Sequence, residues 1–197
     1  MGEHRQSGAG AASLVPPEVL AELGAPMVGD HGVRLEVITE AHRELLRAAC
    51  AQDSEIWEVY PFSMIGEHFD PAFANMTATP HRIAFAAFQH GVVIGTTSFL
   101  AIDPVNHLLE IGGTFFAPSV RGTGYNTEAK RLMIGRAIEA GFTRIELRAD
   151  ARNLRSCAAI AKLGAVKEGV LRKNRITWTG HVRDTAVFSI LAGEWAG

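Results

Sequence analysis

The sequence predicts an α/β (α+β) protein in which a mixed central sheet of about six to seven strands carries helices on both faces. Along the 197 residues, the local patterns follow the order strand, helix, loops, three strands, helix, strand, helix and two strands. A meander of strands followed by a β-α-β unit is typical of a mixed sheet covered on both sides. The length suits one sizeable core, so we expect a single domain over residues 31–197 after an N-terminal extension over residues 1–30.

The first thirty residues are rich in Gly, Ala and Pro, which predicts a partly flexible start with a short helix over residues 17–23. Alternation of apolar and polar residues in VRLEVIT (33–39) predicts a strand. Helical spacing follows over residues 40–52. The aromatic segment from 53 to 80 is expected to be rich in loops.

Three strand-like runs come next, over residues 81–89, 91–102 and 107–116, with a tight turn at His90 and Gly91 between the first two. A helix is expected roughly over residues 127–140, because Gly141 follows it as a stop signal.

The last third of the chain continues the alternation of strand and helix. TRIELRAD (143–150) alternates as a strand does, and residues 153–163 have helical spacing that ends at Gly164. Two final strands are expected over residues 166–178 and 181–195.

The composition excludes several classes of function. The chain has 47% hydrophobic and 20% charged residues and a net charge of −2, which gives no indication of a nucleic-acid partner. No apolar run approaches the ~20 residues that cross a bilayer, so no membrane partner is expected. The two cysteines are far apart and the eight histidines show no ligand spacing, so we expect no metal and a cytoplasmic location.

The stretch RGTGYNTEAK (121–130) places two glycines one residue apart at the start of a helix. A flexible backbone at a helix N-terminus suits an anion, above all a phosphate. A Walker A loop is absent, and a dinucleotide fingerprint lacks its third glycine, since Thr127 stands there. A pyrophosphate cradle made by backbone N–H groups remains, beside the simpler alternative of a left-handed turn with Asn126 or Thr127 as N-cap.

Three ordered motifs resemble those of the GNAT family of N-acetyltransferases. SVRGTGYNTEA is similar to the family's acetyl-CoA loop, Q/R-x-x-G-x-G/A, with Arg121 and Gly124 matching and Asn126 departing from the final Gly or Ala. ADARNLRSCAAIAKLGAVKEGVLR is similar to the second block, N-x-x-S followed by K-L-G. RDTAVFSILAGEW resembles the last strand of the RimJ/RimL branch. The resemblance covers roughly residues 32–195 and implies the GNAT fold with a splayed pair of parallel strands.

The resemblance implies acetyl-CoA as co-substrate, with its pantetheine arm between the strands at 107–116 and 143–150. Main-chain groups of three residues would pair with that arm: Thr114, Phe115 and Phe116. The pyrophosphate would lie on Arg121, Gly122, Thr123, Gly124, Tyr125, Asn126 and Thr127. Asn153 would bind the pantetheine, and Ser156 would lie near the thioester sulfur. The open alternatives are a solvated arginine for Arg121, an N-cap for Asn153 and a small helix-start residue for Ser156.

Aminolysis of a thioester needs a group that accepts the ammonium proton. The candidate is Glu110, because a carboxylate in an apolar strand must face a wet cleft or be paired. The alternative for Glu110 is a structural ion pair with Arg148 or Arg183. Asp184 is a second candidate base, although a hairpin ion pair suits it better. Cys157 is expected to be a small buried hydrophobe rather than an acyl carrier.

The resemblance places the acceptor between the loop-rich segment and the final hairpin, where aromatic rings could hold a substrate. The expected substrate-binding residues are Trp57, Tyr60, Phe69 and Trp178, with Phe62, Glu58, Glu67 and Asp70 nearby, and ordinary packing is the alternative for them. The implied reaction is acetyl transfer to a primary amine, on a protein N-terminus or a small molecule, by direct attack in a ternary complex. A non-catalytic acyl-CoA sensor and a nicotinamide oxidoreductase are the competing hypotheses. The resemblance to the family is also compatible with a homodimer.

Overall fold

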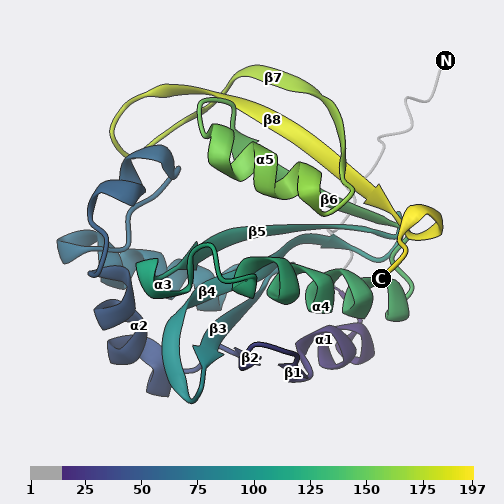
Figure 1. Cartoon of the computed structure of the whole chain (residues 1–197), viewed down its shortest axis with the longest axis horizontal. Helices are drawn as coiled ribbons and strands as arrows, with labels where there is room; N and C mark the ends of the chain where they lie inside the picture. The colour runs from purple at the N-terminus through teal and green to yellow at the C-terminus, as the bar shows by residue number, and fades with distance from the viewer. Residues whose placement is uncertain (1–14) are drawn as a thin grey trace, which may run out of the picture.

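The computed structural model describes residues 15–197, which form an eight-stranded sheet flanked by helices (Figure 1). The strands are β1 (Met27–Val28), β2 (Val33–Val37), β3 (Ile83–Gln89), β4 (Val92–Asp103), β5 (Leu108–Phe116), β6 (Arg144–Asp150), β7 (Val166–Ile176) and β8 (Val182–Leu191). The helices are α1 (Pro17–Gly24), α2 (Arg43–Cys50), α3 (Phe69–Ala78), α4 (Tyr125–Glu139) and α5 (Leu154–Lys162). The 3-10 turns are η1 (Glu40–His42), η2 (Glu55–Val59), η3 (Gly66–His68), η4 (Pro118–Val120) and η5 (Ala192–Glu194).

The sheet is mixed, as the sequence predicts. Its order is β1-β2-β3-β4-β5-β6-β8-β7, and all neighbours pair antiparallel except β5 and β6. The expected count of six to seven strands was too low by β1, whose two residues pair with β2 and are too short to show an alternation. The expected flexibility of the N-terminal extension falls partly on residues 1–14, which lie outside the described residues.

Two hydrophobic cores lie on the two faces of the sheet. One packs beneath α1, α4 and α5, and the other beneath α2, α3 and η2. Strand β3 contributes to both, because Phe85 and Ala87 face the first core while Ala84 and Ala86 face the second. This two-sided burial explains why β3 is apolar at nearly every position instead of alternating.

The segment expected to be rich in loops contains a helix, so that expectation was wrong for α3. Phe69, Phe73 and Met76 follow the helical spacing i, i+4, i+7, and all three are buried. Pro71 obscured this helical pattern in the sequence, because proline often interrupts a helix. In the structure Pro71 lies in the first turn of α3, where proline is tolerated.

Helix α4 begins two residues earlier than expected. Its N-cap is Gly124, at φ 90° and ψ −14°, rather than Asn126 or Thr127. Glycine adopts this left-handed conformation without steric cost, so the chain can turn sharply into the helix there. Helix α5 begins where the sequence places it, with Asn153 as N-cap accepting a hydrogen bond from the Ser156 N–H.

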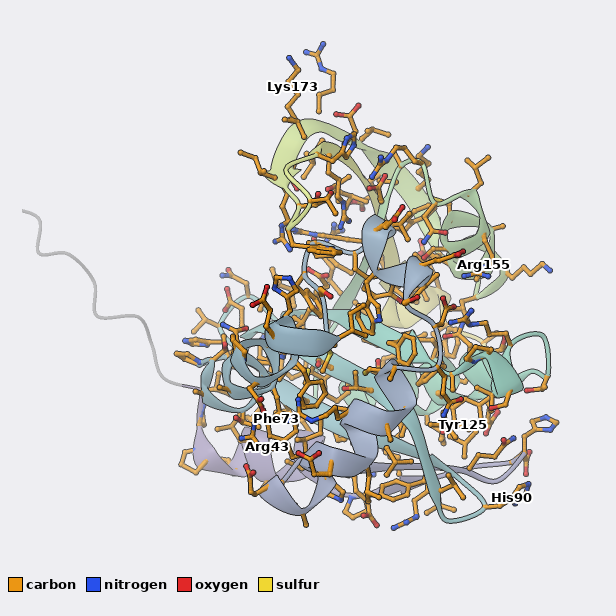
Figure 2. The ribbon with its side chains drawn as sticks, turned by 90° about the vertical axis from the view of Figure 1, so that its left-hand side faces the viewer. Arg43, Phe73, His90, Tyr125, Arg155 and Lys173 are labelled. Carbon is orange, nitrogen blue, oxygen red and sulfur yellow. The ribbon has the colours of Figure 1, made fainter. Side chains whose placement is uncertain are left out.

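Strands β5 and β6 pair over only three residues each, 108–110 with 144–146, and then diverge (Figure 1). The pairing of β5 with β4 is irregular in the same region, between Thr96 and Ser98. The expected splayed pair of parallel strands is therefore confirmed. Figure 2 shows Lys173 of β7 at the opposite end of the molecule from His90 in the β3–β4 turn. No helix within residues 15–197 is long and apolar enough to cross a membrane.

Candidate active site

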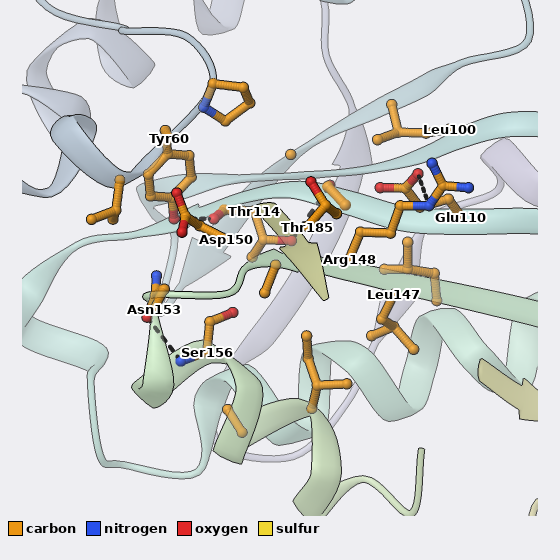
Figure 3. A pocket seen from close by; sticks show the side chains of 18 of the residues that line it. Tyr60, Leu100, Glu110, Thr114, Leu147, Arg148, Asp150, Asn153, Ser156 and Thr185 are labelled. Atoms are coloured by element: carbon orange, nitrogen blue, oxygen red, sulfur yellow. Dashed lines mark hydrogen bonds and ion pairs between the residues drawn. The ribbon is translucent and has the colours of Figure 1, made fainter. Parts of the chain in front are cut away.

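A cavity of about 690 Å³ begins where β5 and β6 separate (Figure 3). Its walls come from β5, β6, the start of α4, α5, the segment around η2 and the β7–β8 hairpin. Of the candidates named from the sequence, these line it: Tyr60, Phe62, Glu110, Thr114, Phe116, Arg121, Gly122, Asn126, Asn153 and Ser156. The structure thus brings the candidate base, the glycine loop and the start of α5 into one space.

Glu110 is the last residue of β5 that pairs with β6, so its carboxylate lies where the gap opens. The side chain is 18% exposed, and Arg148 Nε lies 3.5 Å from its Oε2. Arg148 makes its closer contact elsewhere, 2.8 Å from Glu146 Oε2. Burial raises the pKa of Glu110, and the positive charge of Arg148 opposes that rise. The net result is a pKa above that of an exposed glutamate.

Gly112 and Gly113 clear the floor of the cavity next to Glu110. A Cβ on Gly112 would lie 2.7 Å from Glu110 Oε1, and one on Gly113 would lie 3.3 Å from Arg82 Nη2. Gly113 also has φ 57°, which most side chains avoid. The two glycines therefore let one carboxylate and one guanidinium lie directly on the strand backbone.

Residues 112–116 of β5 continue beyond the last pairing with β6, and the Tyr60 hydroxyl donates a 2.5 Å hydrogen bond to the Thr114 carbonyl. Burial raises the pKa of Tyr60 to about 12, so this hydroxyl keeps its proton. Strand backbone without a strand partner on one side suits an extended ligand with amide groups. This stretch fits the pantetheine arm of a CoA thioester.

The loop before α4 presents backbone rather than side chains. Gly122 and Gly124 both have positive φ, and a Cβ on Gly122 would meet nothing within 4 Å. The Tyr125 side chain turns inward and donates to the Phe88 carbonyl at 2.7 Å. The first N–H groups of a helix lack intrahelical partners, so this loop and the first turn of α4 fit a pyrophosphate.

The Arg121 side chain is not free in solvent. Its Nε donates to the Phe116 carbonyl at 3.2 Å, and its Nη1 is ion-paired with Asp53. Both bonds fasten the end of β5 to the segment before η2. Arg121 lines the cavity from this fixed position, and the solvated alternative does not describe it.

Asn153 and Ser156 lie on the first turn of α5 and line the cavity together (Figure 3). Asn153 Oδ1 accepts from the Ser156 N–H at 3.0 Å, which leaves its amide donors for other partners. Cys157 packs against the first core with its sulfur 3.9 Å from the Asp150 carbonyl. Asp184 is exposed and accepts from the Lys173 N–H at 2.7 Å, within the hairpin.

Several candidates lie away from the cavity lining. Trp57, Phe69 and Phe115 are 0–1% exposed within the second core, where packing accounts for them. Thr123, Gly124, Tyr125 and Thr127 also lie outside the lining. Asp70 accepts from Arg43 and Arg47 at 2.8 Å each, on the outer surface.

Trp178 does not line the cavity and lies in the β7–β8 turn. Its Nε1 donates to the Trp57 carbonyl at 2.8 Å, and its ring lies 5.1 Å from that of His68. The β7–β8 hairpin is thereby fastened to the η2–η3 segment.

Lys130, on α4, was not anticipated from the sequence. It is 6% exposed, lines the cavity, and donates to Thr97 Oγ1 at 3.1 Å and to Thr114 Oγ1 at 2.5 Å. Burial lowers its pKa to about 7. Its spacing offered a signal, because Lys130 stands three and four residues before the buried Met133 and Ile134.

The sequence did not identify Arg82 as a cavity residue, and it suggested Arg183 only as a possible ion-pair partner of Glu110. Both line the cavity. Arg82 stands near the start of the expected strand over residues 81–89, and Arg183 lies between the exposed Val182 and Asp184, so the local sequence gives no sign that either is buried. Within residues 15–197, no group of three or more His, Cys, Asp or Glu side chains is placed to hold a metal ion.

The chain is similar to a family of enzymes and to several solved structures. Residues 33–166 match the model of the acetyltransferase (GNAT) domain. A GNAT-family protein from Chromobacterium violaceum ATCC 12472 is 29% identical with a TM-score of 0.81, over 88% of this chain and 94% of that one. A GCN5-related N-acetyltransferase from Brucella melitensis is 27% identical with a TM-score of 0.81, over 87% and 80% of the two chains.

A more distant structure shares the fold. Mycobacterium smegmatis RimJ, in complex with CoA-disulfide, is 20% identical with a TM-score of 0.75, over 88% of each chain. No curated protein matches the sequence.

Proposed function

The chain belongs to the GNAT acetyltransferase family, and from this premise we propose that it is an acetyl-CoA-dependent N-acetyltransferase that acts on a primary amine. The acetyl group would pass by direct attack of the amine in a ternary complex. One observation carries the proposal: Glu110 lies at the point where β5 and β6 separate, so a base stands at the mouth of the gap that fits the thioester arm.

Each residue has a defined task in this proposal. Acetyl-CoA supplies the activated acetyl group. Glu110 takes the proton from the ammonium of the acceptor, and its raised pKa suits a base that works near neutral pH. The nitrogen forms the new bond to the acetyl carbon as the carbon–sulfur bond breaks. The Ser156 hydroxyl is placed to donate toward the departing sulfur, and holding both reactants in one cavity supplies a further part of the rate.

Further proposals concern the whole protein. We assign residues 31–197 to the acetyltransferase domain, with residues 1–30 as an extension whose α1 and β1 pack onto it. The final-strand motif and the fold shared with RimJ support a place in the RimJ/RimL branch, so we propose protein N-termini and small amines as the acceptors to test. Cys50 and Cys157 are unpaired thiols, which supports a cytoplasmic location, and a homodimer is the assembly to test.

The test combines calorimetric titration of acetyl-CoA with a thiol-release assay across a panel of amines and short peptides. We expect saturable acetyl-CoA binding and thiol release that depends on an amine and is lost in Glu110→Gln. Binding without release for any acceptor would favour the non-catalytic sensor. Absence of binding would overturn the proposal altogether.

A further inference from the structure

The lining of the cavity is strongly basic. Seven Arg or Lys side chains line the cavity against two acidic ones, Glu110 and Asp150. Asp150 is already paired with Arg152 at 2.8 Å, and Glu110 is approached by Arg148. The lining therefore carries more positive charge than its own acids can balance.

Two of these arginines, Arg82 and Arg183, have a buried Nε atom and form no ion pair within residues 15–197. Arg183 is 6% exposed, and its Nε has no hydrogen-bond partner among residues 15–197. The Arg82 Nε is likewise buried and unpartnered there, and the side chain makes one hydrogen bond, from Nη2 to Ser98 Oγ at 3.1 Å. Burial lowers the pKa of Arg82 to about 10, which expresses the cost of keeping its charge inside the protein. A buried guanidinium group normally has an acidic or carbonyl partner. The Nε atoms of Arg82 and Arg183 lack one within residues 15–197, so a bound ligand could supply it.

A second, independent feature lies on the hairpin. Arg175 of β7 stands directly opposite Arg183 of β8, and both line the cavity. Like charges at directly opposed cross-strand positions are destabilising. Neither arginine forms an ion pair within residues 15–197. An anion between them would turn this repulsion into attraction.

The arginines surround the candidate base. Arg148, Arg175 and Arg183 all act electrostatically on Glu110, while Arg82 lies against Gly113, three residues beyond it. A plain cationic amine that approached Glu110 would be repelled by this field. An amine that carries its own negative group would place its ammonium at Glu110 and its anion on the guanidinium groups.

We propose that Arg82, Arg175 and Arg183 bind an anionic group of the acceptor, so that the substrate is a primary amine bearing a carboxylate or a phosphate. This inference rests on the proposed function for the role of the amine. Guanidinium groups bind both anions through paired N–H donors.

The experiment uses two pairs of amines that differ in one anionic group. 4-Aminobutyrate and 4-aminobutyramide test the carboxylate, and phosphoethanolamine and ethanolamine test the phosphate. For each compound we measure binding to the CoA-saturated protein by calorimetry and kcat/KM with acetyl-CoA by thiol release. In at least one pair the anionic member should bind about tenfold to a hundredfold more tightly than its neutral twin, as expected for charge-assisted hydrogen bonds. The pair that shows the preference identifies the anion.

The variants Arg82→Gln, Arg175→Gln and Arg183→Gln should each reduce that preference, and Arg175→Gln with Arg183→Gln together should abolish it. Arg172→Gln is the matched control, because Arg172 is also exposed on β7 but does not line the cavity. Acetyl-CoA affinity measured on each variant shows that the fold is intact. Equal binding of both members of both pairs, or a preference that survives the double variant, would overturn the inference. Anion-selective binding without thiol release, both for these compounds and across the wider panel of amines and peptides, would uphold the inference and refute the proposed reaction.

Discussion

Lys130 Nζ lies 2.5 Å from Thr114 Oγ1, which joins the buried face of α4 to the irregular stretch of β5 beside the cavity. Thr114 is also held from the other side, because its carbonyl accepts from Tyr60. A buried amine and a buried hydroxyl thus fix one strand residue from opposite directions. The contact from α4 depends on a group that titrates, because burial lowers the pKa of Lys130 to about 7, whereas the Tyr60 hydroxyl keeps its proton.

The Lys130 amine should make stability rise with pH. Burial depresses its folded pKa to about 7, well below the ordinary lysine pKa of about 10.4, so the unfolded chain binds the extra proton between these values. Unfolding then takes up a proton, and raising the pH from 7 to 9 should increase the free energy of unfolding, with a slope of at most about 1.4 kcal/mol per pH unit. Denaturant titrations at each pH measure the slope.

Lys130→Met should lose most of this slope, since methionine fills a similar volume without titrating. Lys162→Met, at an exposed site on α5, should keep it. An unchanged slope in Lys130→Met would mean that the pH dependence of stability comes from other groups.

Glu110→Gln should lower kcat by roughly a hundredfold to ten-thousandfold, because that is the usual contribution of a general base. Acetyl-CoA affinity should stay the same. The acidic limb of the pH profile of kcat/KM should lie above the ordinary glutamate pKa in the wild type and disappear in the variant, since burial raises the pKa of Glu110. Asp184→Asn, on the exposed hairpin, is the control and should retain both rate and profile.

The stability of Glu110→Gln separates a base from a structural ion pair. A carboxyl group whose folded pKa is raised contributes stability that is full below its unfolded pKa and lost as the pH rises through the folded pKa. The neutral glutamine does not suffer that loss, so at pH 8 the variant should unfold at a temperature no lower than the wild type. A marked loss of stability would instead indicate that the contact with Arg148 is structural.

Gly124→Ala should weaken acetyl-CoA binding. The alanine must adopt φ 90° at the start of α4, so the helix start should shift and misplace the N–H groups that would face the phosphates in the proposed complex. Gly180→Ala is a matched control, because Gly180 has φ 83° in the hairpin turn and open space around it. Both variants should lose a similar, modest stability in thermal melts, while only Gly124→Ala should raise the Kd for acetyl-CoA in calorimetry.

Asn153 combines two tasks that two substitutions separate. Asn153→Ala should lose the cap of α5, at a cost of about 1 kcal/mol in the free energy of unfolding, together with acetyl-CoA affinity. Asn153→Ser keeps a capping oxygen but lacks the amide donor, so stability should be largely restored while the affinity stays low. Recovery of full affinity in Asn153→Ser would show that Asn153 serves only as a cap.

The order and kind of most elements were predictable, because their signals are local. Asn153 caps α5, Gly141 and Gly164 follow helices, and β6 alternates cleanly. The strand β1 was not predictable, since two residues carry no periodicity and depend on pairing with β2. Helix α3 was not recognised, because its aromatic residues could equally belong to a loop. Their helical spacing is explained by their burial in the second core.

The candidate site divides in the same way. Glu110 could be chosen because a carboxylate within an apolar strand is locally anomalous. Trp57 and Phe69 were predicted to bind the acceptor because they are aromatic. In the structure both are buried in the core, where large apolar surfaces are most stabilising. Lys130, Arg82 and Arg183 acquire their environments from strands and helices far away in the sequence, so no local pattern identifies all three.

The eleven residues of β7 are all exposed, and this edge strand pairs only with β8. Its amide protons should therefore exchange with solvent faster than those of β3 and β4, which are packed on both faces. In the proposed complex, the thioester arm and the acceptor would thus rest on parts of the sheet that open at different free energies. Substitutions in the hairpin would alter which amine is accepted at little risk to folding, while the other half of the cavity stays under the constraints of the core.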